Sequence, residues 1–276
     1  MITRVLIDLC AMISVLLLVG ILGYVFVRGI GSVSWSFLVS EMSSINNTVG
    51  IAGNILNTLY IIVITLLLTV PIGIGSAIYL NEYAKPGKLV SAIEFTTETL
   101  SGIPSIIFGL FGMIFFGNVL GLGYSILTGC FTLTLMVLPL ITRNTQEALK
   151  TVPDSYRTGA LGMGAGKWYM IRTILLPASM PGIITGIILA VGRIVGESAA
   201  LLFTAGSGYM LPKTLSAFGA KLVQPGGTMT VQMYLSMQKG QYDIAFGIAV
   251  VLLVMVLLIN FLTHYVSAKL DVNKKS

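Results

Sequence analysis

The sequence predicts an all-α membrane protein with six transmembrane helices. Of its 276 residues, 55% are hydrophobic and only 9% are charged, whereas soluble domains carry roughly 25% charged residues. The mean hydropathy is +0.94. So few charges cannot cover the surface of a water-soluble protein of this length, and a disordered chain would be polar and rich in charge. Both of these classes are therefore excluded.

Besides the low charge and high hydropathy, the sequence contains long apolar runs. A helix needs about 20 apolar residues to cross the hydrocarbon core. The six candidates are residues 5–27, 55–80, 100–120, 124–142, 182–203 and 244–265. The first run follows Arg4 and could be a secretory signal peptide. It is longer than the roughly 7–15 residues of a signal core, and no small-residue cleavage site follows it. We therefore expect an uncleaved membrane anchor.

Proline and glutamate mark irregular points in the middle spans. The segment from Pro71 to Gly75 should bend or loosen the second span, and Pro139 lies near the end of the fourth. A more polar helical stretch with Glu94 and Glu98 precedes the third span. These two glutamates are expected to be interfacial and solvated, with a gate or a partner contact as the alternative.

The positive charges predict the orientation, since lysine and arginine concentrate in cytoplasmic loops. With the N-terminus inside, the cytoplasmic side holds Arg4, Lys85, Lys88, Arg143, Lys150, Arg157, Lys167, Arg172, Lys269, Lys274 and Lys275. The outer side holds Arg28, Lys213, Lys221 and Lys239. Both termini are therefore expected in the cytoplasm. Charges placed between apolar runs suit a membrane orientation and favour no nucleic-acid partner.

Arg193 and Glu197 are charged residues inside the fifth span. An arginine at mid-helix costs roughly 2.5–3.5 kcal/mol on insertion scales. The two residues are four apart, so both side chains should share one helical face and meet. Two interpretations stay open: a structural salt bridge, or an anion pathway in which Arg193 binds an oxyanion and Glu197 holds the arginine in place.

Other polar side chains in the spans give weaker signals. Ser101 and Ser105 could line a pathway or bond to their own helix. His264, at the end of the last span, suits an interfacial or capping role better than a proton relay. Cys10 and Cys130 lie in separate apolar runs and are interpreted as small core residues. No residues have metal-ligand spacing, and no nucleophile has a base partner, so we expect neither a cofactor nor a catalytic site.

The loop of residues 143–181, predicted to be cytoplasmic, has the pattern of two short helices. Pro153 fits the start of the first helix, and the glycines in 162–166 should stop or bend it. A second helix over 167–176 is expected to end at Pro177. The segment lacks the first glycine and the Ser or Thr of a nucleotide-binding loop. We therefore expect a compact knob that docks on another protein and binds no ATP.

This loop resembles the coupling-loop motif of bacterial ABC-importer permeases, Glu-Ala-Ala, x3, Gly, x9, Ile-x-Leu-Pro. The corresponding positions in this chain are Thr158, Gly159, Ala160, Gly164, Ile174, Leu176 and Pro177, and the Gly, Ile and Leu-Pro positions match at the right spacing. Thr158 and Gly159 depart from the Glu and Ala of the motif. Residues 98–112 and 192–204 resemble the third- and fifth-helix segments of phosphate-importer permeases, and the Ala-Leu-Leu-Phe-Thr ending is closer to the A-type than to the C-type subunit.

The resemblance implies a type I ABC importer (MetI-like) fold and a transport subunit that is not an enzyme. It divides the chain into an anchor helix with outer loop (1–54), a permease domain (55–266) and a cytoplasmic tail (267–276). The implied partners are a C-type permease in a heterodimer, two copies of a cytoplasmic ATPase, an extracytoplasmic phosphate-binding protein and membrane lipid. The implied location is the bacterial or archaeal cytoplasmic membrane.

Two alternatives remain at this point. The chain could carry another oxyanion or small solute, because Arg193 suits any anion and phosphate rests on the resemblance alone. It could instead be a transporter or channel driven by an ion gradient, which would not need the coupling loop.

Overall fold

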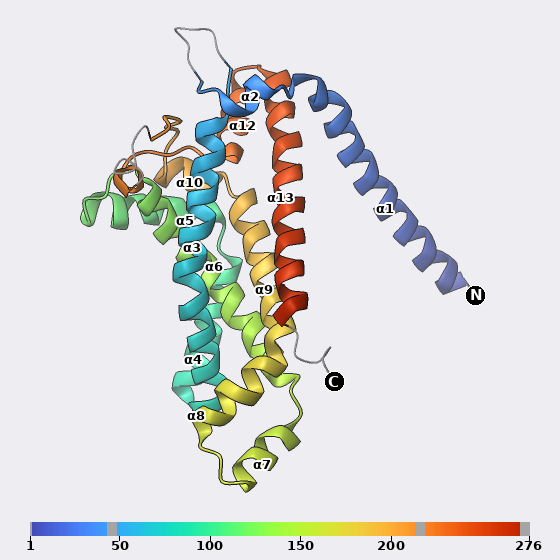
Figure 1. The fold of residues 1–276 in the computed structure, drawn as a ribbon, viewed down its shortest axis with the longest axis vertical. Coiled ribbons are helices and arrows are strands. Elements are labelled where there is room, and N and C mark those ends of the chain that lie inside the picture. Colours follow the sequence, from blue (N-terminus) through green and yellow to red (C-terminus); the bar gives the residue numbers. More distant parts are fainter. Residues whose placement is uncertain (1, 43–48, 213–218, 271–276) are drawn as a thin grey trace.

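The computed structural model describes residues 2–42, 49–212 and 219–270, and this part of the chain is helical without strands (Figure 1). Lys213 and the tail beyond residue 270, which entered the predicted charge distribution, lie outside the described residues. Five helical stretches are long and apolar enough to cross a membrane, and a sixth results if one bent pair counts as a single span. The predicted fold class is confirmed.

Five long helices form the spans. They are α1 (Ile2–Gly29), α3 (Ala52–Ile78), α6 (Ile126–Lys150), α9 (Leu176–Gly196) and α13 (Tyr242–Leu270). Pro71 lies inside α3 and Pro139 inside α6, which continues beyond that proline to Lys150. The fourth span is therefore longer than its apolar run. Its last turns extend into the segment that was predicted to be loop.

The third span is a bent pair of helices and not one straight helix. The chain turns by 102° between α4 (Lys88–Gly102) and α5 (Ser105–Gly112), which continues as the π-helical η3 (Met113–Val119). Proline disfavours helical backbone in the residue before it. Accordingly Ile103, before Pro104, is extended with ψ 131°. The continuous helix expected over 100–120 is thus corrected.

Pro177 does not end a helix, contrary to the prediction. The helix α8 (Lys167–Met170) passes through the π-helical η4 (Ile171–Leu175) directly into α9. A proline inside a regular α-helix removes one hydrogen bond and clashes with the carbonyl four residues earlier. The wider π-helical turn before Pro177 relieves this clash, since its hydrogen bonds span five residues.

Short elements cover the two ends of the bundle (Figure 1). One end, called here the α12 end, carries η1 (Ile30–Ser32), α2 (Trp35–Val39), α10 (Ala199–Thr204), η5 (Lys221–Val223) and α12 (Met229–Gln238). The opposite end, called the α7 end, carries η2 (Tyr79–Tyr83) and α7 (Asp154–Gly162).

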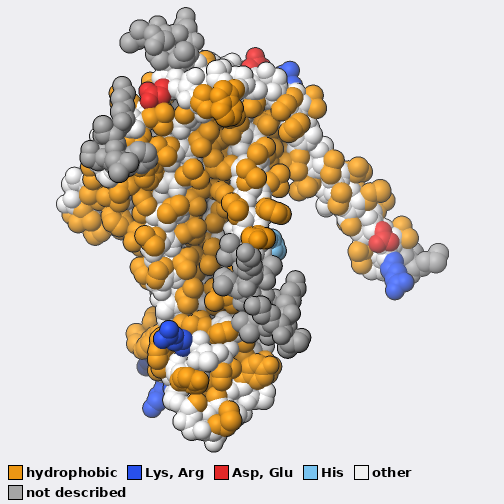
Figure 2. Space-filling model, viewed as in Figure 1, with side chains coloured by type: hydrophobic (Ala, Val, Ile, Leu, Met, Phe, Trp, Pro, Cys, Tyr) orange, Lys and Arg blue, Asp and Glu red, His pale blue; other side chains and the backbone are white. Residues whose placement is uncertain are grey.

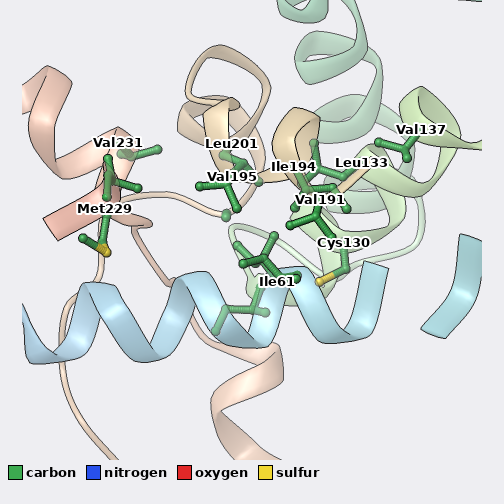
Figure 3. Close-up of a cluster of buried hydrophobic side chains, with 14 of the residues drawn as sticks. Ile61, Cys130, Leu133, Val137, Val191, Ile194, Val195, Leu201, Met229 and Val231 are labelled. Carbon is green, nitrogen blue, oxygen red and sulfur yellow. The ribbon is translucent and has the colours of Figure 1, made fainter. Parts of the chain in front are cut away.

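The main core lies where α3, α6 and α9 pack together below α10 and α12. Figure 3 shows Ile61 of α3 facing Cys130 and Leu133 of α6, with Val191 and Ile194 of α9 beside them. Small residues allow these helices to approach closely. A Cβ atom at Gly73 of α3 would lie 2.7 Å from the side chain of Ile141. Cys130 is buried in this core, which confirms the prediction that it is a core residue.

A second apolar cluster lies at the α7 end, separate from the main core. Its buried members come from α3, α6, α7, α8 and η4 and their connections: Ile78, Leu149, Val152, Ala160, Met170, Ile171 and Leu175. The segment from α7 to α8, called here the knob, therefore has an apolar base of its own. This base attaches the knob to the ends of both α3 and α6.

The helix α1 diverges from the bundle and is exposed along its length (Figures 1 and 2). Its contacts are at its last turns, where Tyr24 packs edge-on against Phe246 of α13 and Gly29 lies against the backbone of the same residue. Cys10 is exposed on α1, so the prediction that it is a core residue is wrong for the chain taken alone. Apolar side chains cover the bundle between its ends (Figure 2), as expected of a surface in contact with lipid or with other helices.

Candidate functional sites on α9 and on the knob

Arg193 lies in the last turn of α9 and not in the middle of a continuous span. A cation in the last turn is favoured by the partial negative charge of a helix C-terminus. The guanidinium is exposed, and its Nη2 lies 3.8 Å from the sulfur of Met136 on α6. The charge is thus supported by the helix end while its hydrogen-bond donors stay available.

Arg193 is part of a continuous exposed face of α9. The other exposed residues follow helical spacing along the same side: Pro181, Thr185, Leu189, Gly192 and Gly196. The opposite face packs into the protein through Ile183, Gly186, Ala190 and Ile194. An exposed arginine within an apolar span is costly against lipid. This face therefore suits a protein partner or an aqueous pathway.

Glu197 does not share a helical face with Arg193, so the predicted meeting of the two side chains is wrong. The helix α9 ends at Gly196, and Glu197 has extended backbone with ψ 123°. Its side chain is turned toward α10, where Oε1 accepts a hydrogen bond of 3.1 Å from the N–H of Ala200. Its carbonyl oxygen accepts another, of 2.9 Å, from Thr230 Oγ1. Glu197 is therefore buried and joins α9, α10 and α12.

Ser101 and Ser105 lie on either side of the bend between α4 and α5. Ser101 is exposed, and its hydroxyl donates to the carbonyl of Thr97 on its own helix at 3.0 Å. Ser105 is half-buried in the first turn of α5. The described contacts do not join either serine to Arg193. A pathway role for the two serines remains a prediction.

A cavity of about 450 Å³ lies inside the bend, between α3, α4, α5 and α6. Its lining is mostly apolar, with hydroxyl groups from Ser76, Thr97 and Thr142. Ser101 and Ser105 are not among the lining residues. Glu94 and Glu98 are exposed on α4, as expected for solvated interfacial residues.

The knob has the two-helix form that the sequence predicts, and its turn explains why glycine stands at position 164. Gly164 has φ +83° and follows the end of α7. Its N–H bonds to the carbonyl of Leu161, and the N–H of Ala165 bonds to the carbonyl of Ala160. This is a Schellman motif, which needs a left-handed residue after the helix. Only glycine takes that conformation without steric cost.

The remaining motif residues divide between the base and the surface of the knob. Ala160 is buried in the second cluster, and Ile174 and Leu176 pack against it. Pro177 is half-buried at the start of α9. Thr158 and Gly159 are exposed on α7, and the Thr158 hydroxyl bonds to the carbonyl of Asp154 at 3.2 Å.

The knob also presents apolar side chains to its surroundings. Met163 is 84% exposed at the tip, and Trp168 and Tyr169 are 58% and 61% exposed. Exposed apolar patches beyond the membrane region mark surfaces that bind another protein. Tyr156 and Leu161 of α7 are also exposed, at 51% and 49%.

A buried ion pair joins the knob to the end of α3, and sequence reasoning missed it. Arg157 Nη2 lies 3.0 Å from Glu82 Oε1, and the two side chains are only 18% and 6% exposed. The partners are 75 positions apart in the chain, so no local spacing signals the contact. The only available sign was a pair of opposite charges in separate loops on the same side.

Within the described part of the chain, no three His, Cys, Asp or Glu side chains gather as a metal site. His264 is exposed near the end of α13.

Residues 69–272 match the family model for the binding-protein-dependent transport system inner membrane component. The chain is 41% identical over 198 residues to the probable ABC transporter permease protein YqgI of Bacillus subtilis, covering 72% of this chain and 67% of that protein. It is 33% identical over 257 residues to the phosphate transport system permease protein PstA of Yersinia pestis, covering 91% and 84%.

The fold resembles a chain of the bacterial alginate ABC transporter, solved in complex with a pentasaccharide-bound periplasmic protein. The TM-score is 0.71 at 16% identity, over 98% of this chain and 97% of that one. At this identity the likeness concerns the fold alone. With most of its length matched by the family model, the chain belongs to the binding-protein-dependent transport system inner membrane components, the permease subunits of ABC importers.

Proposed function

We propose that this chain is the A-type permease subunit of an ATP-driven phosphate importer, with the knob as the docking site of a separate ATPase subunit. The observation that carries the proposal is the knob itself. It is a helix pair with its own apolar base and a Schellman turn at Gly164, and Met163 and Trp168 are exposed on it. A permease that moves with a separate motor needs an exposed handle of this kind.

The charge distribution supports placing the α7 end in the cytoplasm. Seven lysines and arginines gather at or near this end: Lys85, Lys88, Arg143, Lys150, Arg157, Lys167 and Arg172. Arg28, Lys221 and Lys239 lie toward the opposite end. The excess at the α7 end follows the positive-inside rule. In this orientation the α12 end faces outward, toward a phosphate-binding protein.

The exposed face of α9 supports a partner permease with a shared pathway. Arg193 would offer a planar set of donors to phosphate oxygens between the two subunits. The neighbouring Gly192 and Gly196 leave room for a ligand or a facing helix, because a Cβ at either position meets no atom within 4 Å. Since the Glu197 side chain bonds to α10, Arg193 would bind phosphate without help from Glu197. The role of Glu197 would be to fix the turn after α9, next to the arginine.

Phosphate is the proposed substrate because the relatives named as phosphate permeases resemble this chain over most of its length. The test is uptake of labelled phosphate by proteoliposomes containing this chain with its C-type partner, the ATPase and the binding protein. We expect uptake that requires internal ATP and is not reduced by excess sulfate or molybdate. Competition by either anion would indicate another oxyanion, and uptake driven by an ion gradient without ATP would overturn the proposal.

ATPase docking is tested separately by co-purification in mild detergent. Met163→Asp should prevent capture of the ATPase, because it places a charge in the apolar tip. Met237→Asp is the matched control, since Met237 is also exposed, at 47%, but lies on α12 at the opposite end. Equal capture by both variants would contradict docking at the knob.

A further inference from the structure

Arg157 is the most highly bonded side chain of the knob. Its Nε and Nη2 both donate to Glu82 Oε1, at 3.2 and 3.0 Å. Nη2 also donates to the carbonyl of Leu149, and Nη1 donates to the carbonyl of Val152 and to Asp154 Oδ1, at 2.9, 2.9 and 3.0 Å. One guanidinium therefore joins α7 to the last turn of α6 and to η2, the continuation of α3.

Glu82 is held in place for this contact. Asn81 Nδ2 donates to the same Oε1 atom at 2.8 Å. The carboxylate is thus held by a neighbour on its own helix as well as by the arginine, and the ion pair is largely shielded from water. Buried, charge-assisted pairs of this kind are geometrically specific. The exposed ion pairs of Glu147 with Arg143 and Lys150, on α6, lack this shielding.

A second cation of the knob contacts the next residue of η2. Lys167 Nζ, at the start of α8, lies 4.9 Å from the ring centre of Tyr83. The two helices of the knob therefore each hold η2 through one basic side chain. Beneath these contacts, Ile78 of α3 is buried against the apolar base of the knob.

The covalent connections alone do not explain this arrangement. The knob follows α6 through residues 151–153 and leads into α9 through η4, so both of those helices are joined to it by the chain itself. The helix α3 has no such connection. Its contacts with the knob are the apolar base, Glu82 with Arg157, and Tyr83 with Lys167. η2 is also π-helical, a form frequently found at functional sites.

We infer that Glu82 and Arg157, assisted by Lys167 and Tyr83, form a clamp that transmits displacement of the knob to α3 during ATP-driven transport. This inference rests on the proposed function. Glu82 and Arg157 act as positioning residues, since the bonds described for them join one part of this chain to another. Without the clamp, the ATPase would still bind the knob and move α6 and α9, and α3 would be moved through its packing on α6 alone, so that η2 and the α4 helix after it would follow the knob less closely.

The test measures phosphate transported per ATP hydrolysed in proteoliposomes of the complete complex. Glu82→Gln, Arg157→Gln and the double variant should each lower this ratio about fivefold or more, with the ATPase still co-purifying. Because the two residues act as one unit, the double variant should lower the ratio no further than Arg157→Gln. A merely structural defect would reduce transport and hydrolysis together and leave the ratio unchanged, which would overturn the inference.

Two controls separate the clamp from other ion pairs. Asp154→Asn removes the 91% exposed partner of the same arginine, and Glu147→Gln removes an exposed pair on α6. Both should leave the ratio within about twofold of wild type, since exposed pairs contribute little. A fall as large as that of Glu82→Gln in either control would overturn the clamp.

A second measurement stands apart from transport. Arg157→Gln should speed amide hydrogen exchange in residues 79–83, across the pair, and Asp154→Asn should not. Unchanged exchange in this segment would overturn the clamp even if phosphate uptake is normal. If the wild-type complex shows no ATP-dependent uptake, the proposed function fails, and the exchange result then decides the clamp by itself.

Discussion

The carboxylate of Glu197 points away from Arg193 and accepts the backbone N–H of Ala200 at 3.1 Å. Ala200 is fully buried, so this N–H would be unsatisfied without the carboxylate. Leaving a buried donor unpaired costs roughly 1–3 kcal/mol. The contact turns the end of the fifth span into α10, where a continuous helix would otherwise carry both charged residues to one face.

Glu197→Ala should therefore lower the stability of the purified protein by roughly 1–3 kcal/mol, seen as a lower melting temperature in detergent. Glu197→Gln keeps an acceptor oxygen of the same reach and should recover most of the loss. Equal melting temperatures for the alanine variant and wild type would show that the bond to Ala200 contributes nothing.

Arg193→Gln should reduce phosphate uptake by about tenfold or more, because charge-assisted hydrogen bonds contribute about 1.5–3 kcal/mol each, while complex assembly stays intact. Arg193→Lys keeps the charge but not the planar donors and should be intermediate. Arg172→Gln, which changes an exposed arginine of η4, serves as the control in the same uptake assay. Loss of assembly in Arg193→Gln would support the structural interpretation of Arg193.

Two glycines of the knob should respond to alanine in opposite directions. Gly164→Ala forces an L-residue into left-handed backbone at φ +83°, at a cost of roughly 1–2 kcal/mol. Gly159 lies inside the helix with open space around it, so Gly159→Ala should stabilise α7 by roughly 0.5–1 kcal/mol. Limited proteolysis of the knob measures both effects, and equal cleavage rates would contradict the Schellman turn.

Lys221, at the α12 end, should make stability depend on pH. It is only 3% exposed, and burial lowers its pKa, partly opposed by the nearby charge of Glu41. The unfolded chain therefore binds the proton more tightly, so wild type gains stability as pH rises from the lowered value toward about 10.4. Lys221→Met lacks this gain. The measurement is the melting temperature of wild type minus that of Lys221→Met, and this difference should increase as the pH is raised above 7.

The sequence indicated the spans and the knob because long apolar runs and glycine–proline punctuation are local signals. The helix start after Pro153 and the turn at Gly164 are both as expected. Local signals failed at the prolines, because a proline can either break a helix or be accommodated within one. Pro177 is accommodated by a π-helical turn, whereas Pro104 introduces a bend of 102°, and the residues themselves do not distinguish these outcomes.

The site was predictable only in part. Arg193 stood out because a charge in an apolar run is rare, but its distance from Glu197 depends on where α9 ends, at Gly196. The contact of Arg157 with Glu82 joins positions 75 apart, and its existence depends on how α3 and α6 pack. Tertiary packing of this kind leaves no periodic trace in a single sequence.

The two apolar clusters have different surroundings, and this has a consequence for inactivation. The main core is enclosed by membrane-spanning helices, while the cluster around Leu149, Ala160 and Ile171 lies at the end of the bundle under an exposed cap. Mild urea, acting from the aqueous phase, should melt the smaller cluster first. The protein would then remain inserted and helical, but the ATPase could no longer drive it. Transport would therefore be lost before the far-ultraviolet circular dichroism signal of the helices decreases.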